Sequence, residues 1–134
     1  MSTEKECEKE EDMTPGIFSW RELFSEDVVV SQKFYTELLG WTTEVMPMPL
    51  GDYTMFMNDG KPVAGLNPIP DGKEDAGSSW VNYITVEDLD ATLALAEKLG
   101  AKACMEPVTI PGKGRFLGMR DPQDAPIAFW EFAK

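Results

Sequence analysis

The sequence contains no histidine among its 134 residues. Imidazole is the side chain most often used for proton transfer near neutral pH, and it completes Ser-His-Asp triads and Cys-His pairs. Its absence excludes these arrangements within one chain, together with every metal site that needs an imidazole ligand. Any chemistry in this chain must therefore use carboxylates, phenols, indoles, amides or the backbone.

Cysteine and long apolar segments are scarce as well. Cys7 and Cys104 are the two cysteines, too few for a disulfide framework, and Cys7 lies in an acidic stretch with few contacts to hold a bridge. No apolar run approaches the roughly 18–20 residues that cross a bilayer, and we expect no secretory signal. These features predict a reduced, cytoplasmic protein.

Positive charge is in deficit. With 24 acidic and 12 basic side chains, the formal net charge is −12. Such a surface repels phosphate backbones and anionic lipid, so we expect neither nucleic acid nor a membrane as a partner. Residues 1–14 hold six carboxylates against two lysines and have little to bury, which predicts a disordered acidic leader.

Two stretches of the chain repeat one pattern. Asp27 and Asp88 are suitable N-caps, and Gly40 and Gly100 are suitable stops, which predicts helices over residues 28–39 and 89–99. Short strand candidates surround both helices, at residues 17–24, 41–46, 53–57, 62–67, 81–86, 102–105, 115–120 and 125–132. A shared period near 60 residues therefore predicts an α+β domain of two βαβββ modules.

The expected division of the chain follows from this repeat. The first module covers about residues 15–67, a linker rich in Pro, Gly, Asp and Ser covers 68–79, and the second module covers about 80–134. Each sheet with one helix leaves its other face uncovered, and two such sheets enclose a concave cleft suited to a small ligand. The modules can pair within one chain or between two chains, so a homodimer is an alternative to a monomer.

Several segments resemble one known family. They are FSWREL at residues 18–23, Asp27, Phe34-Tyr35, Leu39-Gly40-Trp41, GKPVAGL at residues 60–66, Gly114-Arg115-Phe116 and Asp121-Pro122-Gln123. In this pattern the chain resembles the vicinal oxygen chelate superfamily, which includes glyoxalase I, the bleomycin resistance proteins and the extradiol dioxygenases. The resemblance covers about residues 15–132 and implies a glyoxalase-like domain over 15–134. This fold hosts several chemistries as well as pure binders.

The resemblance also implies where a metal would be bound. Members that use a metal take one ligand, usually His or Glu, from the first and from the last strand of each module. These positions correspond to Trp20, Gly65, Val81 and Ala128 in this sequence. None of these side chains can ligate a divalent ion, and a shift of one residue does not help. We therefore expect no metal and no cofactor.

Side-chain alternation along the strands predicts the wall of the cleft. The residues expected to point inward are Trp20, Glu22, Gly65, Asn67, Val81, Tyr83, Ala128 and Trp130, with Phe18 beside them. This wall is aromatic and amide-bearing, with one carboxylate. It suits a planar or partly apolar small molecule held by stacking and a few hydrogen bonds.

The function predicted first is a metal-independent small-molecule binder of the bleomycin-resistance type. The alternative is a lyase, isomerase or hydrolase-like enzyme that uses Glu22 as its candidate catalytic residue, or a metal bound through carboxylates alone. Glu22 can also form a structural ion pair with Arg115 or Arg120. In a third interpretation, Trp20 and Trp130 fill the cleft and the modules serve mainly in dimerisation.

Overall fold

The computed structural model describes residues 13–134, so Cys7 and most of the expected acidic leader lie outside the described part. The elements are β1 (Phe18–Ser25), α2 (Val28–Leu39), β2 (Thr42–Met46), β3 (Tyr53–Asn58), β4 (Lys61–Pro68), the short 3₁₀ helix η1 (Glu74–Ala76), β5 (Ser79–Thr85), α3 (Leu89–Lys98), β6 (Lys102–Ala103), β7 (Val108–Ile110), β8 (Gly114–Arg120) and β9 (Pro126–Phe132). None of the helices within residues 13–134 is long and apolar enough to cross a membrane.

Both α-helices begin at the predicted capping residues. The Asp27 carboxylate accepts the backbone N–H of Val30 at 3.2 Å, and the Asp88 carboxylate accepts that of Ala91 at 3.0 Å. After α2 the chain leaves the helix through Gly40, whose φ of 74° lies in the left-handed region that glycine adopts without strain. The helix predictions are therefore confirmed, α3 ending one residue earlier than expected.

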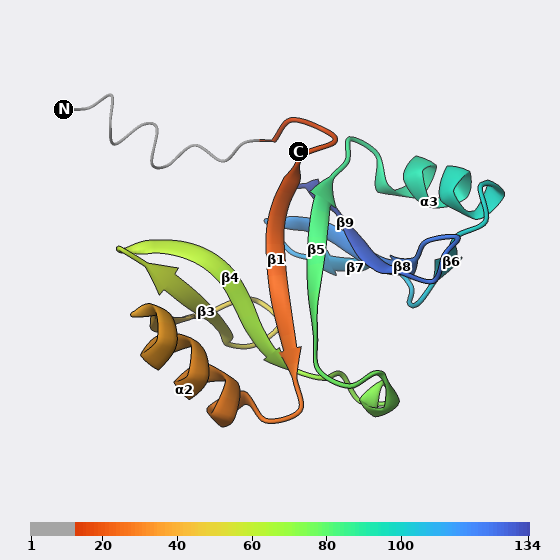
Figure 1. Cartoon of the computed structure of the whole chain (residues 1–134). Coiled ribbons are helices and arrows are strands. Elements are labelled where there is room, and N and C mark those ends of the chain that lie inside the picture. The colour runs from red at the N-terminus through yellow and green to blue at the C-terminus, as the bar shows by residue number, and fades with distance from the viewer. Residues whose placement is uncertain (1–12) are drawn as a thin grey trace.

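The strands form one continuous sheet in the order β2-β3-β4-β1-β5-β9-β8-β6, with β7 paired to β8. In each module the first strand runs parallel to the last, as β1 does to β4 and β5 to β9. The antiparallel pair β1–β5 lies at the centre of the molecule and joins the modules within one chain (Figure 1). This arrangement confirms the predicted α+β fold of two βαβββ modules, with the short strand β7 as an addition.

Both helices cover the same face of this sheet. Leu23 and Leu66 lie in the core beneath α2, and Leu117 lies in the core beneath α3. Strand β5 pairs with Leu23 of the first core on one side and with Phe129 of the second core on the other. The two β5 residues that form these pairs are an even number of positions apart, so their side chains point to the same face of the sheet. The opposite side, called here the helix-free face, therefore carries the alternate residues of each strand.

One β-bulge changes the predicted alternation at the beginning of β1. Phe18 lies opposite Ile84 whereas Trp20 lies opposite Tyr83, so Ser19 is an extra residue in the ladder. Phe18 leaves the row of Trp20 and is 61% exposed. The expectation that Phe18 points inward beside Trp20 is therefore wrong, because the bulge interrupts the period of two.

Candidate functional site

A buried carboxylate lies at the centre of the helix-free face. Glu22 is only 7% exposed. Its Oε2 accepts hydrogen bonds from the Tyr53 hydroxyl at 2.5 Å and from Asn67 Nδ2 at 2.8 Å, and its Oε1 accepts one from the Tyr83 hydroxyl. Trp20 Nε1 in turn donates to the Tyr53 oxygen at 2.8 Å. These five side chains are called the Glu22 cluster below.

Strand register explains how the chain assembles this cluster. Trp20 and Glu22 are two residues apart on β1 and so share a face, and Gly65 of β4 lies directly opposite Glu22. A Cβ atom at Gly65 would lie 2.0 Å from the Tyr53 hydroxyl oxygen. Glycine at this position therefore leaves the space through which Tyr53, from the neighbouring strand β3, reaches Glu22.

No cation balances Glu22 within the described residues. The ion pairs formed by residues 13–134 do not involve it. The three donors to its carboxylate are two phenols and an amide, all neutral. An unpaired buried carboxylate is costly unless hydrogen bonds satisfy it. The cluster supplies those bonds, so Glu22 is held by neutral donors alone.

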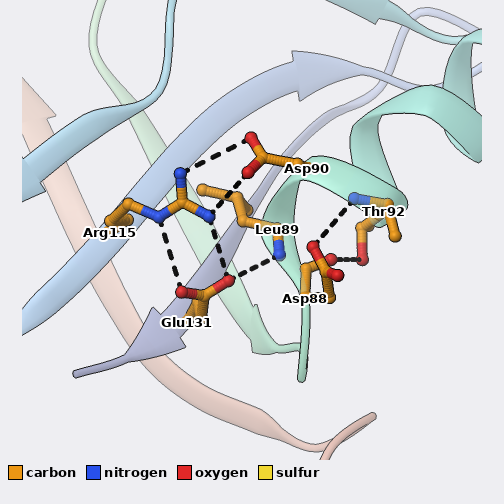
Figure 2. A network of polar contacts seen from close by, with 7 residues as sticks. Asp88, Leu89, Asp90, Thr92, Arg115 and Glu131 are labelled. Atoms are coloured by element: carbon orange, nitrogen blue, oxygen red, sulfur yellow. Dashed lines mark hydrogen bonds and ion pairs between the residues drawn. The ribbon is translucent and has the colours of Figure 1, made fainter. Parts of the chain in front are cut away.

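The predicted ion pair of Glu22 with Arg115 or Arg120 is wrong. Arg115 bridges Asp90 and Glu131 where α3 begins, with Nη2 contacts of 3.1 Å to each, as Figure 2 shows. Glu131 also accepts the Leu89 N–H at 2.7 Å (Figure 2). The Arg115 guanidinium, aided by that N–H, lowers the pKa of Glu131. Arg120 donates to the Asp124 carbonyl instead.

Both tyrosines of the cluster are fixed as hydrogen-bond donors. Burial, with the charge of Glu22 as the second cause, raises the pKa of Tyr53 and of Tyr83 far above the ordinary phenol value of 10.0. Both hydroxyls therefore stay protonated under physiological conditions. They can donate to Glu22 but cannot serve as bases.

The second-module half of the helix-free face is aromatic. The ring of Tyr83 lies edge-on to Phe116, with centroids 6.2 Å apart, and Phe116 stacks with Trp130 at 6.5 Å and an interplanar angle of 22°. Tyr83 belongs both to this aromatic row and to the Glu22 cluster. One half of the face thus carries hydrogen-bonding groups, and the other half carries apolar rings next to them.

The eight predicted site residues differ in how closely they are associated with the Glu22 cluster. Trp20, Glu22, Asn67 and Tyr83 meet through hydrogen bonds, and Gly65 lies beneath Tyr53. Val81 lies opposite Glu22, and the buried Ala128 lies opposite Tyr83. Trp130 is farther from Glu22 and connects to it through Phe116 and Tyr83.

Two members of the face were missed in the sequence, Tyr53 and Phe116. Both lie in predicted strands, but neither strand had a predicted partner register. A signal was present in Gly65. A glycine within a strand marks the close approach of another group, and here that group is Tyr53.

The residues at the module junction do not fit a metal. Where the first and last strands of each module meet, Gly65 pairs with Glu22 and Ala128 pairs with Tyr83. The predicted first-strand ligand positions, Trp20 and Val81, therefore lie two residues before the residues that face Gly65 and Ala128. Among the residues at the junction, only Glu22 carries a common metal ligand, and three donors already occupy its oxygens. Within residues 13–134, no three His, Cys, Asp or Glu residues come together as a metal-binding group.

Comparisons with known proteins agree on the family. The model of the Glyoxalase/Bleomycin resistance protein/Dioxygenase superfamily matches residues 17–129, which confirms the resemblance noted in the sequence. Anthracycline biosynthesis protein DnrV of Streptomyces peucetius is 36% identical over 129 residues, covering 87% of this chain and 47% of that protein. Putative glyoxylase CFP32 of Mycobacterium tuberculosis is 32% identical over 126 residues, covering 92% and 48%.

The chain therefore spans about half the length of these curated relatives. A solved structure shows the same fold at lower identity. A glyoxalase/bleomycin resistance protein/dioxygenase superfamily member from Vibrio splendidus superposes with a TM-score of 0.56 and 18% identity, covering 84% of this chain and 96% of that one. The glyoxalase-like fold is thus established.

Proposed function

Because the chain belongs to the glyoxalase/bleomycin resistance protein/dioxygenase superfamily, we propose that it is a metal-independent small-molecule-binding protein. Its ligand is aromatic or partly apolar and lies on the helix-free face between the modules. The observation that carries the proposal is the Glu22 cluster, in which three neutral donors satisfy the buried carboxylate that a metal would need as a ligand. The ligand-binding residues proposed are Trp20, Glu22, Gly65, Asn67, Val81, Tyr83, Ala128 and Trp130, together with Tyr53 and Phe116.

The aromatic row supports the ligand class. Beside the buried Tyr83, Phe116 and Trp130 present stacked rings that suit a planar molecule. Phe116 and Trp130 are also incompletely buried, which leaves ring surface for contact. The name of the relative from Streptomyces peucetius refers to anthracycline biosynthesis.

Tryptophan fluorescence can test this function because the four tryptophans divide between the two faces. Trp20 and Trp130 lie on the helix-free face, whereas Trp41 and Trp80 pack against Tyr35 of α2. We propose to titrate EDTA-treated protein with 1,4-dihydroxyanthraquinone and to compare single Trp→Phe variants. Trp20→Phe and Trp130→Phe should each remove part of the quenching and weaken binding about twofold to tenfold.

The matched controls are Trp41→Phe and Trp80→Phe, which should leave the affinity unchanged. Loss of quenching in these controls alone would place the ligand on the helix side and contradict the proposal. Binding that appears only after Zn²⁺ or Mn²⁺ is added would contradict metal independence.

A second candidate function is a metal-free lyase or isomerase. It is favoured by one observation, a carboxylate that is 7% exposed and has no cation beside it in the described part of the chain. Such a group can accept a proton from a carbon acid bound against it. The test is deuterium exchange of the α-hydrogens of 2-tetralone in D₂O, followed by NMR.

In that experiment Glu22→Gln should abolish any exchange above the buffer rate, and the exposed Glu26→Gln should leave it unchanged. Exchange that is equal in all three proteins would remove the catalytic role of Glu22. Binding of 2-tetralone without exchange would support the binding function and contradict the catalytic one.

The proposal for partners and location follows the charge of the chain. A net charge of −12 supports the absence of nucleic-acid and membrane partners, and the scarcity of cysteine supports a cytoplasmic location. A homodimer belongs to the same proposal, because members of this superfamily often dimerise. Light scattering at several concentrations tests it, with a mass of twice 14.9 kDa as the expected result and the monomer mass throughout as the contrary one.

A further inference from the structure

The Glu22 cluster leaves hydrogen-bonding capacity on one residue above all. Asn67 donates its amide N–H groups to Glu22 Oε2, at 2.8 Å, and to the Tyr53 hydroxyl. Its Oδ1 has no partner among residues 13–134, and the side chain is only half-buried. By contrast, Tyr83 is 8% exposed and donates its only proton to Glu22.

Glu22 also fixes which way the Asn67 amide points. The amide presents its nitrogen to Glu22, because Nδ2 donates to the carboxylate oxygen Oε2 at 2.8 Å. The carbonyl oxygen is then directed away from the contact with Glu22. Asn67 thus offers one acceptor, its Oδ1, in a fixed orientation, and Glu22 is its positioning residue.

Charge limits what this amide can bind. Among residues 13–134 no cation pairs with Glu22, its donors are neutral, and the whole chain carries −12. An anionic ligand beside Asn67 would be repelled by the Glu22 carboxylate across a short, poorly solvated distance. A neutral hydroxyl group meets no such repulsion, and it can donate its proton to Oδ1 of Asn67.

The aromatic row determines which ligand shape suits the rest of the site. It begins at Tyr83, which donates to Glu22, and continues through Phe116 to Trp130. A fused-ring ligand lying along this row would therefore direct its polar edge toward the Glu22 cluster.

We infer that Asn67 is the specificity-determining residue of this face and that the ligand class is a neutral, planar aromatic molecule bearing a hydroxyl group. This inference rests on the proposed binding function, because it assigns the ligand class of the same site.

Three probes of one shape test it: 2-naphthol, naphthalene and 2-naphthoate. Binding is measured by tryptophan fluorescence near neutral pH. The expected result is that 2-naphthol binds at least about tenfold more tightly than naphthalene and more tightly than 2-naphthoate. Asn67→Ala should reduce the advantage of 2-naphthol over naphthalene to about threefold or less while leaving naphthalene binding unchanged.

The matched control is Asn82→Ala, since Asn82 lies on the central strand β5 opposite Arg21 and is exposed on the other face. It should change none of the three affinities. If Asn67→Ala does not fold, Asn67→Ser keeps a donor for Glu22 but lacks the carbonyl, and it should lose the preference in the same way.

The outcomes separate the two claims. Tightest binding of 2-naphthoate, or an equal loss of all three ligands in Asn67→Ala, would overturn this inference and leave the binding function standing. Failure of all three probes to bind would overturn the inference and the proposed aromatic-binding function together.

Discussion

Replacing Gly65 by alanine tests the packing on which the Glu22 cluster depends. The added Cβ would lie 2.0 Å from the Tyr53 hydroxyl oxygen, 2.7 Å from its Cζ and 2.9 Å from Glu22 Cγ. A phenol ring cannot deform, so Tyr53 must swing away from β4. Its hydrogen bonds to Glu22 and from Trp20 are then lost.

The magnitude follows from those two bonds. A hydrogen bond to a charged acceptor contributes about 1.5–3 kcal/mol and a neutral one about 1 kcal/mol. Alanine returns about 0.4–1 kcal/mol by restricting the unfolded chain. Gly65→Ala should therefore destabilise the protein by about 2–3 kcal/mol, or lower its Tm by about 10 °C.

The assay is urea unfolding followed by circular dichroism, with Gly118→Ala as the matched control. Gly118 is also a strand glycine without positive φ, but its added Cβ would meet only Met105 Sδ at 3.6 Å. This control should stay within about 0.5 kcal/mol of the parent chain. Equal stability of the two variants would refute the placement of Tyr53 over Gly65.

Three further predictions concern other polar contacts. Tyr83→Phe removes a donor from buried Glu22 and should cost about 2 kcal/mol in urea unfolding; no loss would contradict the contact. Asp88→Ala removes an N-cap and should cost about 1 kcal/mol, measured by thermal melting, whereas an unchanged Tm would contradict the cap. Arg115 lowers the pKa of Glu131 below its ordinary 4.5, so this pair stabilises the protein above that pH and the contribution is lost as the pH falls through the lower folded-state pKa. The stability difference between the parent chain and Glu131→Gln should therefore shrink from neutral pH to about pH 3, and a constant difference would contradict the shift.

Local signals in the sequence were sufficient for the helices and the module repeat. Asp27 and Gly40 satisfy the ends of α2 within a few residues of chain, so their effect does not depend on distant partners. The same pattern around α3 made the repeat, and hence the fold, predictable.

The site was only partly predictable because strand register is not local. Alternation identified Glu22 and Tyr83 as neighbours on one face, but it could not show that Gly65 pairs with Glu22 and not with Trp20. The bulge at Ser19 likewise depends on the pairing of β1 with β5. Charge complementarity suggested arginine partners for Glu22, whereas the structure satisfies this carboxylate with neutral donors.

The most direct test of the central claim is an NMR titration that follows the indole N–H signals of the four tryptophans. Protein treated with EDTA is titrated with 2-naphthol. The account predicts that the Trp20 and Trp130 signals shift with a common affinity while those of Trp41 and Trp80 stay in place. Shifts confined to Trp41 and Trp80, or shifts that require an added divalent metal, would contradict it.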